Sequence, residues 1–126
     1  MKKQIVSAQN APAALGPYSH AVLAGDTLYI SGQLGLDPAT GAMPESVTEQ
    51  AEQSLKNLGA ILEAAGMSYA DVVKTTVFLS DMNDFAAINE VYARFFASDC
   101  PARSCVQAAA LPKGAKFEAE AIAVKG

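Results

Sequence analysis

The sequence predicts an α+β fold in which two helices pack on one face of a mixed β-sheet. Segments rich in alternating and β-branched residues indicate strands, and two stretches with apolar residues at helical spacing indicate helices. Their order along the 126 residues is β-β-β-α-β-α-β-β. A strand–helix–strand unit that occurs twice places both helices on the same face. The chain can bury a core as one domain, residues 1–126, and the uncovered sheet face predicts an oligomer.

The first third of the chain predicts three strands. They are expected over residues 3–7, 21–24 and 27–33. The loop over residues 10–17 holds two prolines, which cannot donate to a ladder. Gly25-Asp26 is a two-residue signal for a tight hairpin between the second and third strands. Gly32, inside the third strand, predicts a bulge or the close approach of a ligand or a neighbouring chain.

The middle of the chain predicts two amphipathic helices around a strand. Ser46 and Glu49 form a capping box, and Gly66 is the stop signal of a first helix that we expect to be scaffold. β-branched residues over 72–79 indicate the strand. The second helix follows the capping residues at 80–84, and Asn89 lies off its apolar stripe, as a solvated residue would. The stripe consists of Phe85, Ile88, Tyr92 and Phe95.

The last two strands are predicted to form a hairpin. Two alternating runs, residues 101–106 and 116–124, flank a turn signal at residues 111–114. An antiparallel pairing would place Cys105 opposite Glu118.

Arg103, Cys105 and Gln107 would share one face of this hairpin, because side chains alternate along a strand. A guanidinium and the Glu118 carboxylate that meet on one face suit binding and acid–base chemistry on a small anion. They also suit a structural ion pair, which these residues alone favour because structural pairs are common.

Three other polar residues are candidates for a site. Glu120 shares its strand face with Glu118 and with apolar side chains, and a half-buried glutamate needs a partner. Tyr18 follows the proline-rich loop and is either a pocket wall or a packed ring with a solvated hydroxyl. His20 has no second ligand type nearby, so we do not expect it to act as a base.

Composition and charge exclude several classes of partner. The net charge is −4 and the pI is about 4.8, with no run of Lys or Arg, so a nucleic-acid partner is not expected. No apolar segment approaches membrane-spanning length, and we expect a cytoplasmic protein without a membrane partner. Cys100 and Cys105 are expected to be free thiols, and with His20 they make no metal set.

Several sequence blocks form one ordered set along the chain. They are residues 11–19, 30–33, 73–79, 83–85 with Asn89, 101–106, 111–114 and 118–123. Together they resemble the RidA/YjgF family of small imine deaminases, over about residues 10 to 124. The Pro-Ala-Arg-Ser block, residues 101–104, together with the spaced glutamate is the most specific part.

The resemblance implies a chorismate-mutase-like α+β fold and a homotrimer with active sites in clefts between subunits. The implied substrates are 2-imino acids such as 2-iminobutanoate and 2-iminopropanoate, which are hydrolysed to 2-oxo acids and ammonia without a cofactor. By matching position, Arg103 would hold the substrate carboxylate and Glu118 would position or activate water. Backbone groups around Cys105 and Gly32 would contact the imine. The residues implied to line the pocket are Tyr18, Ser31 and Asn89.

These implied roles agree with the chemistry of the residues. A guanidinium binds a carboxylate through two parallel hydrogen bonds and so orients the adjacent carbon. A glutamate within one water of that carbon can act as a general base and then return the proton to the leaving ammonia. A second reading is a trimeric sensor that binds a 2-oxo acid without catalysis; Arg103 suits both readings, and Glu118 favours the enzyme. RNA cleavage is a third reading, which the acidic composition opposes.

The sequence departs from the family pattern at three places. The connection over residues 97–100 is short and places Cys100 where an aromatic residue is common. His20 stands where glutamine is common, and Ala119 replaces a branched aliphatic residue. These departures concern substrate range, because none of them changes Arg103 or Glu118.

Overall fold

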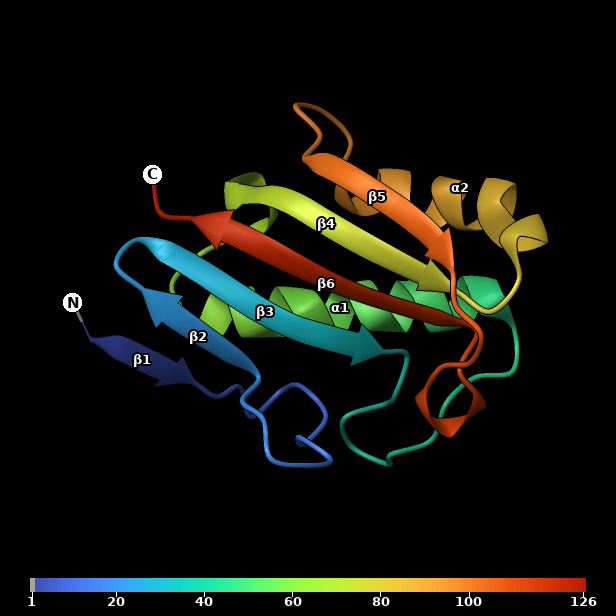
Figure 1. The fold of residues 1–126 in the computed structure, drawn as a ribbon, viewed down its shortest axis with the longest axis horizontal. Coiled ribbons are helices and arrows are strands. Elements are labelled where there is room, and N and C mark those ends of the chain that lie inside the picture. Colours follow the sequence, from blue (N-terminus) through green and yellow to red (C-terminus); the bar gives the residue numbers. More distant parts are fainter. Residues whose placement is uncertain (1) are drawn as a thin grey trace.

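The computed structural model describes residues 2–126, which form a six-stranded β-sheet and two α-helices (Figure 1). The strands are β1 (Lys3–Val6), β2 (Ala21–Ala24), β3 (Thr27–Leu34), β4 (Val72–Leu79), β5 (Ala102–Gln107) and β6 (Phe117–Val124). The helices are α1 (Val47–Ala64) and α2 (Phe85–Phe95), and 3₁₀ turns cover Tyr69–Asp71, Met82–Asp84 and Pro112–Gly114. The order of elements is the predicted one.

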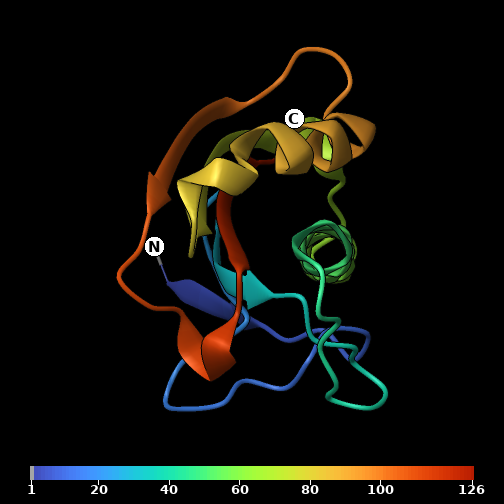
Figure 2. The same ribbon diagram turned by 90° about the vertical axis from the view of Figure 1, so that its right-hand side faces the viewer.

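The strand order across the sheet is β1-β2-β3-β6-β4-β5. β4 and β5 are parallel, and all other neighbouring pairs are antiparallel, so the sheet is mixed. Figure 2 shows both helices on the same side of the sheet. The predicted α+β arrangement, with one face of a mixed sheet covered by two helices, is confirmed.

The predicted hairpin between the last two strands is wrong. β5 pairs with one edge of β4, and β6 pairs with the other edge of β4 and with β3. Cys105 therefore lies opposite Val77, and Glu118 lies opposite Phe78. The reason is the crossover through α2, which returns the chain parallel to β4 at the outer edge of the sheet. The last strand then enters the centre, where both of its edges are hydrogen-bonded.

The core lies between the sheet and the helices. On β6, every second side chain faces α1 and is buried: Phe117, Ala119, Ala121 and Ala123. The fully buried side chains of α1 include Leu55, Leu58, Ile61 and Leu62. Small residues on the central strand leave room for these larger ones, as close packing requires. Ala119 thus belongs to the core, on the face of β6 opposite to Glu118.

α1 begins and ends at the predicted signals. The Ser46 hydroxyl oxygen accepts a hydrogen bond from the Glu49 backbone N–H at 3.2 Å and donates to the Glu49 carboxylate at 3.0 Å. Gly66 follows the helix with a φ of 74°, a backbone conformation that glycine adopts without steric cost.

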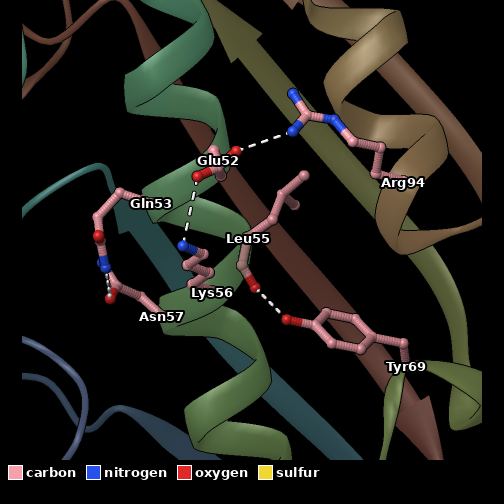
Figure 3. Close-up of polar contacts among 7 residues, drawn as sticks. All are labelled: Glu52, Gln53, Leu55, Lys56, Asn57, Tyr69 and Arg94. Carbon is pink, nitrogen blue, oxygen red and sulfur yellow. Dashed lines mark hydrogen bonds and ion pairs between the residues drawn. The ribbon is translucent and has the colours of Figure 1, made fainter.

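Polar contacts link α1 to its neighbours (Figure 3). Arg94 Nη1 of α2 lies 2.9 Å from Glu52 Oε1, and Lys56 Nζ lies 3.3 Å from Glu52 Oε2. The Tyr69 hydroxyl donates to the Leu55 carbonyl oxygen at 2.6 Å. The Lys56–Glu52 pair lies within α1, and the Arg94–Glu52 pair joins α2 to α1. Because both ion pairs are solvent-exposed, they add little stability, and the apolar core carries most of the packing energy.

Asn57 connects α1 to the end of β3. Its amide nitrogen donates to the carbonyl oxygens of Leu34 and Leu36 at 3.0 and 2.9 Å. Its amide oxygen accepts from Gln53 Nε2 at 2.9 Å, the short contact drawn in Figure 3. This buried side chain therefore fixes the chain where it leaves β3, close to Gly32.

His20 holds the N-terminal loop against the sheet. Its Nδ1 accepts a hydrogen bond from the Ala8 backbone N–H at 3.0 Å, and its Nε2 lies 2.7 Å from the Pro12 carbonyl oxygen. These two contacts require the neutral tautomer with the proton on Nε2. The structure thus assigns His20 to loop anchoring.

The sheet face away from the helices, called the open face below, carries exposed apolar side chains. Tyr29 is 50% exposed, Val106 45% and Val124 37%. The strand register places these three on the same side as Glu118 and Ile122. The predicted uncovered face is therefore present. No helix within residues 2–126 has the length and apolar composition needed to cross a membrane.

The hydrogen bonds of Asn57 lead to a stability prediction. Asn57→Ala leaves the buried carbonyl oxygens of Leu34 and Leu36 without a partner, which should lower the free energy of unfolding by about 1–3 kcal/mol. Lys56→Ala, at the neighbouring exposed position, should change it by less than about 0.5 kcal/mol. Urea denaturation at one protein concentration measures both, and equal losses in the two variants would contradict the anchoring role.

Candidate functional site

The sheet register separates Arg103 from Glu118. Arg103 lies opposite Thr75, whose side chain is fully buried beneath the helices, whereas Glu118 lies opposite Phe78 on the open face. The two groups therefore project from opposite faces of the sheet, and they form no ion pair within the described part of one chain. The ion pairs among residues 2–126 are Lys56–Glu52 and Arg94–Glu52. The predicted meeting of guanidinium and carboxylate on one face of a single chain is wrong.

Arg103 lies in a cluster with side chains of α2. Its Nη1 donates to Asn89 Oδ1 at 2.8 Å. Its Cζ atom lies 4.7 Å from the ring centroid of Tyr92 and 5.4 Å from that of Phe85. We call Arg103, Asn89, Phe85, Tyr92 and Cys105 the arginine cluster. Asn89 is thus a partner of Arg103, and not the solvated residue expected from the helix pattern alone.

Sequence reasoning missed Phe85 and Tyr92 as members of the cluster, because their spacing assigned them to the buried stripe. A local signal for their position was available. Residues 85, 89 and 92 are spaced by four and three along α2, so the two aromatic side chains flank Asn89 on one helix face.

Burial affects two titratable groups of the arginine cluster. Burial raises the pKa of the Tyr92 phenol, which its hydrogen bond with Thr75 and the charge of Arg103 partly oppose. Burial also raises the pKa of the Cys105 thiol, again against the charge of Arg103. Cys105 is a free thiol, as predicted. With both groups neutral at pH 7, the guanidinium carries the charge of this cluster.

Glu118 lies beside a bulge of β3. Between Ile30 and Gln33 the register with β6 shifts, so that Ser31 and Gly32 together face Glu120. A Cβ atom at position 32 would lie 2.5 Å from Glu118 Oε2. The predicted bulge is therefore confirmed, and the absence of a side chain at Gly32 leaves the space that the Glu118 carboxylate occupies.

The segment before β2 supports this bulge. The Ser31 hydroxyl donates to the Ser19 carbonyl oxygen at 2.7 Å. The Tyr18 side chain is about half exposed, and its hydroxyl accepts from the Leu15 backbone N–H at 3.1 Å. Tyr18 and Gly32 both line a small cavity of about 30 Å³. We call Glu118, Glu120, Gly32, Ser31 and Tyr18 the glutamate cluster.

The environment of Glu118 favours its protonated form. The carboxyl is half-buried, and burial raises its pKa above the ordinary value of 4.5. The charge of Glu120 raises the pKa further, because both carboxylates project from the same face of β6. A carboxyl group with a raised pKa is suited to take up and return a proton during a reaction. Among residues 2–126 no three His, Cys, Asp or Glu side chains are grouped as metal ligands.

The predicted site residues therefore form two clusters. The structure brings Arg103, Asn89 and Cys105 together on the helix side, and Glu118, Gly32, Ser31 and Tyr18 together at the bulge. Each cluster holds one of the two charged groups that the sequence analysis singled out.

Comparisons with known proteins extend along nearly the whole chain. The family described as Endoribonuclease L-PSP matches residues 8–125. A goat (Capra hircus) protein named 2-iminobutanoate/2-iminopropanoate deaminase is 57% identical over 125 residues, which cover 98% of this chain and 91% of that protein. The crystal structure of RidA from the Antarctic bacterium Psychrobacter is 51% identical with a TM-score of 0.95, and the match covers 97% of this chain and 99% of that one. Escherichia coli TdcF, crystallised with bound serine, is 50% identical with a TM-score of 0.95, over 98% of this chain and 99% of that one.

The carboxyl pair of β6 leads to a titration prediction. The side-chain carboxyl of Glu118 should titrate with a midpoint above pH 4.5, as followed by carbon-13 NMR of the intact protein. Glu120→Gln removes a neighbouring negative charge and should lower that midpoint. Glu90→Gln removes one charge from the exposed side of α2 and should leave it unchanged. An unchanged midpoint in Glu120→Gln would show that the two carboxylates do not interact.

Proposed function

The chain belongs to the RidA/YjgF family, and on that premise we propose how its two clusters act on a substrate. The protein is a deaminase of reactive 2-imino acids, with 2-iminobutanoate and 2-iminopropanoate as substrates, which is the activity named for relatives at 52–57% identity. The observation that supports the proposed site most directly is the environment of Arg103. Its guanidinium is oriented by Asn89 and by aromatic rings, yet no carboxylate of the described chain pairs with it.

Arg103 binds the substrate carboxylate in this proposal. A planar guanidinium offers two parallel N–H donors to a carboxylate, which fixes the plane of the 2-imino acid. The imine carbon is directly attached to that carboxylate, so its position is fixed as well. E. coli TdcF, whose structure contains serine, is a relative that binds a molecule of this size and carrying a carboxylate.

Glu118 is the proton carrier in the proposal. Its carboxylate takes a proton from water as the water oxygen bonds to the imine carbon and the C=N π electrons move to nitrogen, and Glu118 then gives this proton to the nitrogen. Glu118 next takes the proton of the new hydroxyl as the C=O bond forms and passes it to the nitrogen as the C–N bond breaks, so that a 2-oxo acid and ammonia leave. Water is the one co-reactant. The raised pKa of Glu118 suits a group that must take up and return a proton twice per turnover.

The opposite placement of the two groups supports a site that is shared between chains. Arg103 of one chain can meet Glu118 of a neighbour if the open face is covered in a closed ring of subunits. The apolar side chains exposed on that face, Tyr29, Val106 and Val124, favour such burial. We therefore propose a homotrimer with three equivalent sites, in which each interface joins the arginine cluster of one chain to the glutamate cluster of the next.

Three other expectations stay predictions. The chorismate-mutase-like assignment rests on the resemblance, whereas the organisation of residues 1–126 as one domain and the cytoplasmic location rest on length and composition. The family description names a ribonuclease, but the net charge of −4 opposes binding to RNA phosphates. A sensor that binds a 2-oxo acid without turnover would use Arg103 in the same way, so rate measurements separate it from the enzyme.

The test of the proposed function is turnover of an imine that is generated in the assay. With 2-iminobutanoate formed in situ from threonine, the wild-type protein should accelerate the appearance of 2-oxobutanoate. Arg103→Ala should lower kcat/KM by about 30-fold to several thousand-fold, the cost of losing one partner of a desolvated charge pair. Arg103→Lys keeps the charge without the fork and should recover part of the loss.

The matched control is Arg94→Ala, which removes an exposed arginine of α2 and should leave kcat/KM near the wild-type value. If 2-oxobutanoate binds to the wild type but its rate of appearance stays uncatalysed, the protein is a sensor. If Arg103→Ala unfolds the protein while Arg103→Lys restores full activity, Arg103 has a structural role only.

Subunit mixing tests the shared site. Glu118→Gln should lower turnover by roughly 100-fold or more, the scale of general-base loss. When Arg103→Ala and Glu118→Gln chains are refolded together at equal amounts, about a quarter of the interfaces should combine two intact groups, and activity should return to about that fraction. A mixture of either variant with the double variant forms no intact interface and is the control. Absence of recovery in the first mixture would place both groups in the site of a single chain.

A further inference from the structure

The guanidinium of Arg103 is held by groups of unequal rigidity. Asn89 accepts one N–H at 2.8 Å, which fixes one end of the guanidinium. Tyr92 and Phe85 lie near it as aromatic rings, at 4.7 and 5.4 Å from its Cζ atom. A partly buried arginine without a carboxylate partner otherwise has several rotamers, and fixing them costs binding free energy. The residue that restrains the guanidinium before substrate arrives therefore affects substrate affinity.

Tyr92 is the more firmly fixed of the two rings. Its side chain is buried, and its hydroxyl lies 2.8 Å from Thr75 Oγ1, a fully buried group. Its ring also packs against Phe96, with centroids 4.7 Å apart. Phe85, by contrast, is the first residue of α2 and is 38% exposed. Tyr92 thus presents a ring whose position is set from two sides.

Tyr92, on α2, contacts one residue on each of two neighbouring strands. Thr75 and Arg103 are register partners on the parallel strands β4 and β5. Tyr92 reaches this row from α2, bonds to Thr75 through its hydroxyl and faces Arg103 with its ring. A shift of the ring would therefore break either the buried hydrogen bond or the cation–π contact.

A buried Thr–Tyr pair is a costly way to pack a core. Two apolar side chains of the same shape would fill the space without a hydrogen-bond requirement. The polar pair is explained if it sets the tilt of the ring beneath the guanidinium. The burial that raises the pKa of the Tyr92 phenol also keeps the ring neutral across the physiological range, so its interaction with Arg103 does not change with pH there.

We infer that Tyr92, tethered by Thr75, is a positioning residue that orients the Arg103 guanidinium for the substrate carboxylate. The inference rests on the proposed role of Arg103. Tyr92 does not touch the substrate in this arrangement and acts through Arg103. Its contribution should therefore appear in the binding of any molecule that Arg103 holds by a carboxylate, including the 2-oxo acid product.

Two variants measure the contribution. Tyr92→Leu removes the cation–π contact and should raise KM, together with the dissociation constant of 2-oxobutanoate, by about 2- to 30-fold, with a smaller change in kcat. Thr75→Val combined with Tyr92→Phe replaces both buried polar groups by apolar ones of similar shape. This double variant should keep the melting temperature and still raise KM, because the ring has lost its tether. If Tyr92→Leu does not fold, the double variant still tests the contribution of Tyr92.

Tyr69→Phe is the matched control. Tyr69 is a partly buried tyrosine, and its hydroxyl donates to the Leu55 carbonyl oxygen away from Arg103. Its variant should lower the melting temperature and leave KM unchanged. An increase of KM in the Tyr69 variant as large as in the Tyr92 variants would show that general loosening of the core accounts for the effect, and it would overturn the inference.

A double-mutant cycle separates this inference from the proposed function. In the Arg103→Ala background, Tyr92→Leu should have no further effect on the residual rate, because Tyr92 acts only through the Arg103 guanidinium. An equal loss in both backgrounds would make Tyr92 a structural residue and overturn the inference alone. If Arg103→Ala itself leaves KM and product binding unchanged, the proposed role of Arg103 in substrate binding is wrong, whatever the result for Tyr92.

Discussion

The position of β6 in the centre of the sheet is the constraint on which the site depends. β6 separates β3 from β4 and is hydrogen-bonded to both. On its helix side it carries Phe117 and three alanines, which let α1 pack closely. On its other side it carries Glu118 and Glu120, which a helix packed on that face would bury at a high cost. The same strand therefore builds the core and leaves the opposite face open.

The two sheet faces provide the two charged groups with different environments. Arg103 lies against aromatic rings and an amide, which attract a cation without neutralising it. Glu118 lies over the backbone of Gly32 and near a second carboxylate. This environment disfavours the ionised form of its carboxyl group. In the proposed mechanism, the first environment would preserve a full charge for binding, and the second would prepare a group for proton transfer. Neither face of a single chain supplies both environments.

Covering the open face would complete the site and strengthen its electrostatics at the same time. Apolar side chains such as Tyr29 and Val106 lie on the face that carries Glu118, so a neighbour that buries them also removes water from the carboxylate. Removing water lowers the local dielectric and makes both the guanidinium–carboxylate attraction and the proton transfer more sensitive to geometry. Assembly and catalysis would then depend on the same surface.

Local sequence signals were sufficient to predict the helices and strands, but they did not predict which strands lie side by side in the sheet. The capping residue Ser46, the stop at Gly66 and the bulge at Gly32 are properties of a few adjacent residues, and all three are present as predicted. The alternation along β6 also showed that Glu118 and Glu120 share a face, and the resemblance identified the family. The strand that pairs with β5 could not be predicted from local signals. The pairing of distant strands depends on the crossover through α2 and on packing that no short segment contains. That pairing decides on which side of the sheet Arg103 lies and brings Tyr92 and Thr75 to it, so the division of the site into two clusters is a property of the tertiary structure alone.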